Sequence, residues 1–139
     1  MRPTNGVVEV PEFCTNGVAD HTQLLGVVGV FTVDEGSRRD LRDELRRTWM
    51  RASVRVPQSL YATFVARGRG PAAAALRAEA KQHGGDILFV DADSALPRSI
   101  GPLVTLLEWW QCAAIAWPAA QLIGKADDDV TCSAQRTNS

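Results

Sequence analysis

Residues 24–33 read LLGVVGVFTV, an almost unbroken run of apolar and β-branched side chains. Such a run is typical of a strand inside a parallel sheet, where helices cover both faces and neither face meets water. The acidic pair Asp34 and Glu35 ends the run, and Ser37 followed by Asp40 resembles the capping box at the start of a helix. We therefore predict a buried strand over 24–33 and a helix after it.

The same alternation of strand and helix continues to residue 126. Short apolar runs predict three further strands, and apolar spacing with early prolines predicts the helices. The GRGP sequence at 68–71 is expected to end the second strand. This order predicts an α/β fold with a parallel sheet and helices on both faces. The predicted strands are 24–33, 60–66, 86–91 and 121–126, and the predicted helices are 37–49, 71–83 and 102–114.

Composition limits the class of protein. The chain has 139 residues, 45% of them hydrophobic and 22% charged, which suffices for the core of one globular domain. Its net charge of −1 excludes the broadly basic surface on which non-specific nucleic-acid binding depends. Residues 1–23 contain no run apolar enough for a signal peptide or anchor. The most apolar stretch, 103–119, contains Glu108, and we interpret it as a buried helix with a connector.

The three cysteines, Cys14, Cys112 and Cys132, are widely spaced and odd in number. This pattern indicates neither a disulfide scaffold nor a paired-cysteine zinc site. We interpret Cys112, which lies in a predicted helix, as a small buried apolar side chain. The cysteines therefore do not indicate whether the protein is located in a reducing or an oxidising compartment.

Three of the four predicted strands end in acidic residues. Asp34 and Glu35 follow the first strand, Asp91 and Asp93 follow the third, and residues 127–129 are all aspartate. Ligands of open α/β sheets bind at the carboxyl ends of the strands, so we expect these carboxylates to gather at close range. Clustered carboxylates repel one another unless a cation neutralises them, and their hard oxygens suit Mg²⁺ or Mn²⁺, which in turn binds a diphosphate. The alternative for the aspartate triplet is a solvated turn.

Arginine is concentrated in and after the first predicted helix. For most of these residues we predict a solvated helix face with local pairs such as Asp43 with Arg46. Arg38 and Arg39 differ because they lie in the first turn after the first strand, near the predicted ligand edge, where a guanidinium can meet a phosphate. The seven arginines are Arg38, Arg39, Arg42, Arg46, Arg47, Arg51 and Arg55.

Four segments of the chain form a recognisable pattern. They are RRDLRDELRRTW (38–49), LRAEAKQHGGDIL (76–88), EWWQC (108–112) and GKADDDV (124–130). In order and approximate spacing they resemble the β-1,3-galactosyltransferase family, glycosyltransferase family 31. That family has an arginine-rich helix ending in Arg-x-Thr-Trp, then Glu before Gly-Asp-Ile-Leu, then Trp near Cys, then Lys-x-Asp-Asp-Asp-Val. The resemblance covers about residues 24–130.

The resemblance implies a Rossmann-like fold and an inverting, galactosyltransferase-like hexosyltransferase. Such an enzyme works on the lumenal side of the Golgi membrane and transfers a hexose from a UDP-sugar to an acceptor glycan. It uses Mn²⁺ or Mg²⁺, for which Asp129 and Asp127 are the expected ligands, and the metal acts as a Lewis acid on the departing UDP. The expected donor-binding residues are Arg38, Asp91, Asp127 and Asp128.

The chain departs from the family pattern in two ways. Where the family has the lysine of a Tyr-x-Asn-Leu-Thr-x-Lys-Thr stretch, this chain has Gly101. The carboxylate general base for the acceptor hydroxyl lies beyond the triplet in the family, so we expect it beyond residue 139 and predict no catalytic residue here. We predict an irregular segment (1–23), an incomplete donor-binding domain (24–130) and a polar tail (131–139). We expect a fragment of a transferase, and its activity alone is an open question.

Two other interpretations stay open. Asp34, Glu35 and Asp91 at strand ends, with Lys125 further on, also suit a receiver-like phosphoacceptor module that would be phosphorylated on Asp91. The second alternative is a non-catalytic fragment, because a sheet of four strands leaves an edge unpaired.

Overall fold

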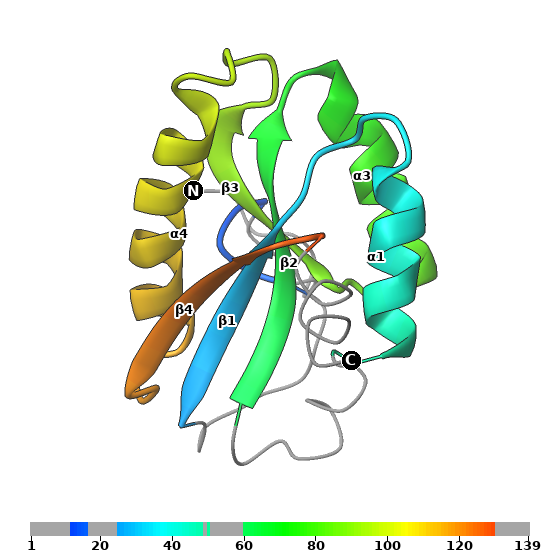
Figure 1. The fold of residues 1–139 in the computed structure, drawn as a ribbon. Coiled ribbons are helices and arrows are strands. Elements are labelled where there is room, and N and C mark those ends of the chain that lie inside the picture. The colour runs from blue at the N-terminus through cyan, green and yellow to red at the C-terminus, as the bar shows by residue number, and fades with distance from the viewer. Residues whose placement is uncertain (1–11, 17–24, 49, 51–59, 130–139) are drawn as a thin grey trace, which may run out of the picture.

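The computed structural model describes residues 12–16, 25–48, 50 and 60–129. Within them, strands and helices alternate along the chain (Figure 1). The strands are β1 (Gly26–Phe31), β2 (Leu60–Arg69), β3 (Ile87–Asp93) and β4 (Leu122–Asp127), and the helices are α1 (Arg38–Arg47), α3 (Pro71–Gln82) and α4 (Gly101–Ala116).

The strands form one parallel sheet in the order β3-β2-β1-β4. Helices α1 and α3 cover one face and α4 covers the other (Figure 1). The predicted parallel α/β sheet with helices on both faces is confirmed. From β1 the chain moves outward to β3, and α4 then returns it to the opposite side of β1. The strand order therefore reverses between β1 and β4, the kind of position where open α/β sheets bind ligands.

The apolar run at 24–33 produces β1 because both of its faces are buried. Val27 packs with Trp109 of α4, whereas Val30 packs with Leu45 of α1 and with Leu76 of α3 on the other face. Val27 and Val30 are each 0% exposed. Burying a valine fully contributes about 1.5–3 kcal/mol, so both layers stabilise the strand.

Strand β2 is longer than predicted. The GRGP sequence does not end it at residue 66, because β2 continues to Arg69 with a shift of register against β3 between Arg67 and Arg69. At Gly68 two aromatic side chains approach the backbone of the strand closely. A Cβ at this position would lie 2.8 Å from Phe13 and 3.0 Å from Phe89. A shift of register of this kind is typical of a β-bulge, and a glycine inside a strand often marks one. The extension carries Arg67 to the carboxyl end of the sheet.

The described part of the N-terminal segment, residues 12–16, contacts the sheet. The backbone N–H of Cys14 donates to the carbonyl of Phe89 in β3 at 2.9 Å. Cys14 also forms a disulfide with Cys112 of α4. Cys112 is buried in the core, as interpreted, but it is bonded to Cys14, which the spacing of the cysteines did not indicate. The two cysteines are 98 residues apart, so only the packing of α4 beside the edge of β3 brings them together.

Helix α4 contains most of the apolar stretch 103–119. One face packs on the sheet through Trp109, Cys112 and Ala113, while Leu107 and Ile115 remain exposed on the other. Among the described residues, no helix has the length and apolar character needed to cross a membrane.

Candidate functional site

A cavity of about 230 Å³ opens at the carboxyl ends of β1 and β4, where the strand order reverses. We call it the switch-point cavity. Its walls come from the end of β1, the starts of α1 and α4, the end of β2 and the end of β4. The residues that line it are Phe31, Thr32, Val33, Arg38, Arg67, Pro102, Thr105, Lys125, Asp127, Asp128 and Asp129.

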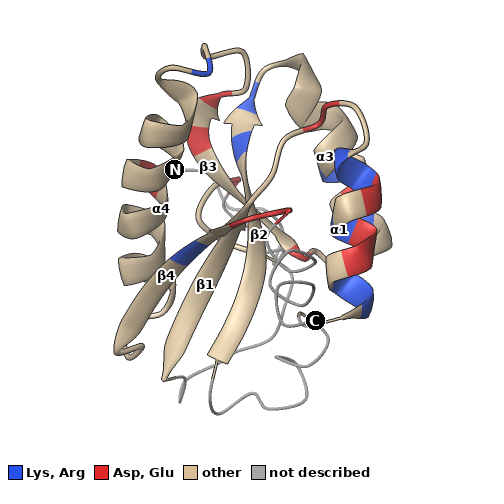
Figure 2. Cartoon of the chain, viewed as in Figure 1, with Lys and Arg blue, Asp and Glu red and all other residues tan. Residues whose placement is uncertain are grey.

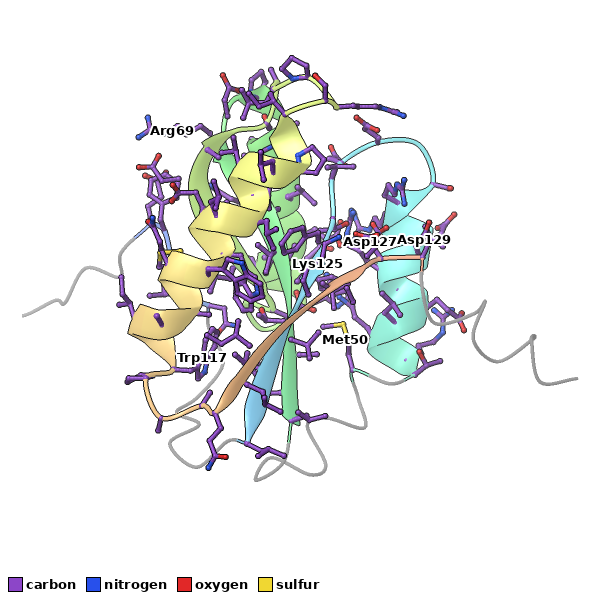
Figure 3. The ribbon with its side chains drawn as sticks, turned by 60° about the vertical axis from the view of Figure 1, so that its left-hand side comes forward. Met50, Arg69, Trp117, Lys125, Asp127 and Asp129 are labelled. Carbon is purple, nitrogen blue, oxygen red and sulfur yellow. A yellow bond between two sulfur atoms is a disulfide. The ribbon has the colours of Figure 1, made fainter. Side chains whose placement is uncertain are left out.

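The aspartate triplet is part of this cavity. Asp127 and Asp129 are exposed, and Figure 3 shows both at the end of β4 beside α1. Asp128, between them, is only 4% exposed. Strand β4 ends at Asp127 and the chain turns at the next two residues, so the triplet offers two accessible carboxylates and one buried carboxylate.

Asp128 is held by the elements around it. Its carboxylate accepts a hydrogen bond from the hydroxyl of Thr32 at 2.9 Å and another from Arg38 at 2.7 Å. Burial raises the pKa of Asp128, while the hydrogen bonds from Thr32 and Arg38 oppose that rise. Asp128 therefore joins the end of β4 to β1 and α1, and it fixes the direction in which the triplet leaves the sheet.

Asp127 has a weaker attachment. Lys125, two residues earlier on the same side of β4, donates to its carboxylate at 2.8 Å. The Asp127 side chain is 57% exposed and that of Lys125 is 36% exposed. An ion pair this exposed contributes little to stability, so Asp127 can exchange Lys125 for another cation at small cost.

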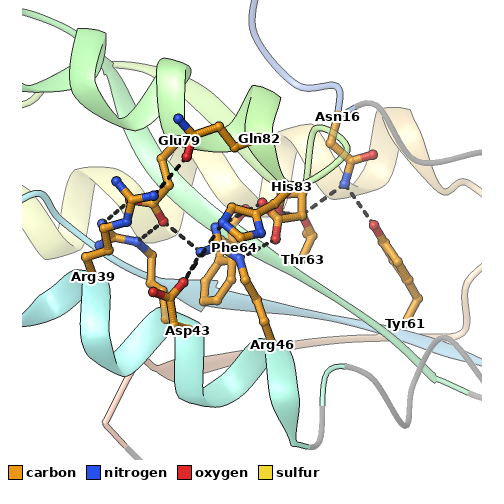
Figure 4. Close-up of polar contacts among 12 residues, drawn as sticks. Asn16, Arg39, Asp43, Arg46, Tyr61, Thr63, Phe64, Glu79, Gln82 and His83 are labelled. Carbon is orange, nitrogen blue, oxygen red and sulfur yellow. Dashed lines mark hydrogen bonds and ion pairs between the residues drawn. The ribbon is translucent and has the colours of Figure 1, made fainter.

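The prediction of a solvated helix face is wrong for Arg42 and Arg46. Arg47 is exposed and has a local partner, and positions 51 and 55 lie outside the described residues. Arg42 is 0% exposed and pairs with Glu79 of α3. Arg46 pairs with Glu79, with Asp86 and, as predicted, with Asp43. Figure 4 shows Asp43, Arg46 and Glu79 between the two helices. The physical reason is the packing of α1 against α3, which places Glu79 where the arginines bury their charge.

A hydrogen-bond network connects this buried pair to the cavity. Arg42 donates to the hydroxyl of Thr32 at 2.8 Å, and Thr32 in turn donates to Asp128. Sequence reasoning missed Arg42, Glu79 and Thr32 as parts of the site. One signal was present: Glu79 lies three residues after Leu76, on the face of the alanine-rich helix that packs inward.

The other predicted site residues lie apart from the triplet. Asp91, at the end of β3, pairs with exposed Arg69, which holds the pKa of Asp91 below its usual range. Arg69 appears on the opposite side of the molecule from Asp127 and Asp129 in Figure 3. Arg39 donates to Gln82 of α3 at 2.9 Å.

The expected gathering of all the acidic strand ends at close range is wrong. The strand order places β3 two strands away from β1, and Figure 2 shows acidic residues at separate places along the carboxyl edge. Asp34 and Glu35 line a different cavity of about 30 Å³. A receiver-like module needs Asp91 beside the acids of the first strand, and this strand order does not provide that.

The donor set at the switch-point cavity suits a hard cation. Among residues 12–16, 25–48, 50 and 60–129, no three His, Cys, Asp or Glu side chains are grouped as a ready metal centre. Mg²⁺ is typically held by one or two carboxylates together with substrate phosphates and water. The exposed carboxylates of Asp127 and Asp129 fit that mode, because a phosphate ligand supplies the remaining oxygens.

The family model described as Galactosyltransferase matches residues 40–138. The matched span includes Arg42, Glu79 and the aspartate triplet, whereas Thr32 and Arg38 precede it. No curated protein and no solved structure gives a significant match to the chain.

Proposed function

This chain belongs to the galactosyltransferase family, and from that premise we propose that it binds the donor of a metal-dependent, inverting hexosyltransferase of the β-1,3 type, glycosyltransferase family 31. The donor is a UDP-sugar, and the second substrate is an acceptor glycan. The observation that carries the proposal is the aspartate triplet in the switch-point cavity, with two exposed carboxylates beside the cations Arg38 and Lys125.

In this proposal Asp129 and Asp127 would hold Mn²⁺ or Mg²⁺ together with the donor diphosphate. The chemistry supplied by these residues with the metal in place would be Lewis-acid neutralisation of the departing UDP. Asp128 keeps the triplet in place through its contacts with Thr32 and Arg38. The acceptor site and the general base stay expectations from the resemblance, and we assign no residue of this chain to them.

Arg38 has a second role toward the donor. Its side chain is 38% exposed and lines the cavity while one of its N–H groups is bonded to Asp128. A guanidinium has five N–H donors, so Arg38 can hold Asp128 and still donate to a phosphate oxygen. Arg38 thus orients an anionic ligand relative to the triplet.

We also propose that the chain works on the lumenal side of the Golgi membrane. The disulfide between Cys14 and Cys112 supports this, because disulfides form and persist in oxidising compartments. Alkylation of free thiols in intact cells, followed by peptide mapping, tests the idea. Protected Cys14 and Cys112 are expected, and full alkylation of both would contradict a lumenal location.

Calorimetric titration of UDP into the chain tests the donor site. We expect binding in the presence of Mn²⁺ and its loss in EDTA. Asp129→Asn and Asp127→Asn should remove the metal-dependent part of the binding. Asp91→Asn is the matched control, because Asp91 is exposed and lies outside the cavity. A folded wild-type chain that binds no UDP with Mn²⁺ present would refute the proposal. Loss of UDP binding in Asp91→Asn would show that Asp91 takes part in donor binding after all.

A further inference from the structure

Arg67, near the end of β2, lines the switch-point cavity and has no ionic partner within residues 12–16, 25–48, 50 and 60–129. Its guanidinium donates one hydrogen bond, to the hydroxyl of Thr105 in α4 at 3.1 Å. No carboxylate among the described residues forms an ion pair with it. The other two cations of the cavity, Arg38 and Lys125, each have an aspartate partner. Arg67 is therefore the one of these three cations that forms no ion pair with the residues that the structure describes.

Arg67 occupies space that Gly101 leaves free. A Cβ at position 101 would lie 2.6 Å from Nη1 and 2.9 Å from Cζ of Arg67, which is closer than real Cβ atoms approach. Any larger residue at the start of α4 would displace the guanidinium. Helix α4 contains no Lys or Arg, so the cation in this space comes from β2.

The hydrogen-bonding capacity of Arg67 suits an anion. The first turn of a helix carries a partial positive charge, so the start of α4 does not balance the guanidinium. One N–H of Arg67 is bonded to Thr105, and the fork of remaining N–H groups matches the oxygens of a phosphate. The half-buried position of Arg67 strengthens such a contact relative to one at the open surface.

We propose that Arg67 binds the phosphates of the donor in the space that Gly101 provides. This inference rests on the proposed function, because it assigns a further residue to the same cavity. It makes Arg67 and Gly101 a functional pair: replacing Gly101 should lower phosphate affinity only when residue 67 is arginine.

The test compares UDP, uridine and inorganic pyrophosphate in calorimetric titrations with Mn²⁺ present. Arg67→Met should weaken UDP and pyrophosphate binding about 10- to 100-fold, the effect of losing a charge-assisted hydrogen bond. It should leave the affinity for uridine, which has no phosphate, unchanged. Arg67→Lys should keep part of the phosphate affinity. Circular dichroism confirms that each variant is folded.

The outcomes separate this inference from the proposed function. Unchanged UDP affinity in Arg67→Met, or an equal loss for UDP and uridine, overturns the assignment of Arg67 alone. If the chain binds pyrophosphate, loses that binding in Arg67→Met and does not bind UDP, the phosphate site at Arg67 is supported and the proposed function is refuted. A wild-type chain that binds neither ligand refutes both.

Gly101→Ala tests the pairing. In the wild-type background the new methyl group displaces Arg67, so UDP affinity should fall. In the Arg67→Met background the same substitution should have no effect, and this non-additivity is the signature of the pair. Gly101→Lys combined with Arg67→Met should restore part of the lost affinity. Equal effects of Gly101→Ala in both backgrounds would overturn the pairing.

Discussion

The guanidinium of Arg42 donates two hydrogen bonds to the carboxylate of Glu79, at 2.7 and 2.6 Å. Neither side chain is more than 3% exposed. The pair joins α1 to α3, and the remaining donors of Arg42 reach Thr32 and the carbonyl of Val33 at 2.8 Å each. Because Thr32 is bonded to Asp128, this buried pair supports the geometry of the cavity as well as the packing of the helices.

Breaking the pair on one side should destabilise the fold strongly. Arg42→Met and Glu79→Gln each leave a buried polar partner without compensation, and such changes cost about 3–5 kcal/mol. Urea unfolding measures the loss. Glu44→Gln is the matched control, because Glu44 pairs with Arg47 on the exposed side of α1 and should contribute less than about 1 kcal/mol. Equal effects at positions 79 and 44 would contradict the role of burial.

The stability supplied by Glu79 should depend on pH. Burial alone would raise the pKa of Glu79, but the hydrogen bonds and charges of Arg42 and Arg46 outweigh it and lower the pKa. A lowered carboxyl pKa stabilises the fold above the unfolded value of about 4.3, and that contribution is lost as the pH falls through the folded value. The free-energy difference between wild type and Glu79→Gln should therefore shrink from pH 7 to pH 3. A difference that stays constant over this range would refute the assignment.

Thr32→Val should weaken the donor site more than the fold. The substitution removes the hydroxyl that accepts from Arg42 and donates to Asp128, so Asp128 loses one of the two contacts that orient the triplet. We expect Mn²⁺-dependent UDP affinity to fall about tenfold, as when a buried acceptor loses its donor. Thr32→Ser keeps the hydroxyl and should bind UDP almost as wild type does. Equal affinities of the Val and Ser variants would show that the contact does not orient Asp128.

Reduction of the disulfide should lower the stability of the chain. Cys14 and Cys112 are 98 residues apart, and a crosslink over a loop of this length contributes about 2–5 kcal/mol, chiefly by restricting the unfolded chain in the chain-entropy model. Urea unfolding with and without reductant measures the difference. The double variant Cys14→Ser with Cys112→Ser should respond to reductant no further. A non-reduced digest without the peptide pair that joins Cys14 to Cys112 would contradict the crosslink.

Much of the fold followed from local sequence. The apolar run at 24–33 predicted β1, and the repeated alternation of strand and helix predicted the parallel α/β sheet, because burial on two faces leaves a continuous apolar pattern. The end of β4 also placed the aspartate triplet at the carboxyl edge. The β2 boundary was wrong because a glycine that usually interrupts a strand here allows Phe13 and Phe89 to approach the backbone.

The site depended on contacts between distant parts of the chain. Local periodicity says which residues form a strand but not which strands are neighbours, so the separation of Asp91 from the triplet required the order β3-β2-β1-β4. The burial of Arg42 against Glu79 required the packing of two helices. Arg67 gained a place in the cavity only because Gly101 lies opposite it. The amino-acid sequence alone thus determined which segments form strands and helices and in what order they follow one another. The tertiary structure determined which charged side chains form pairs, because such pairs depend on proximity in space.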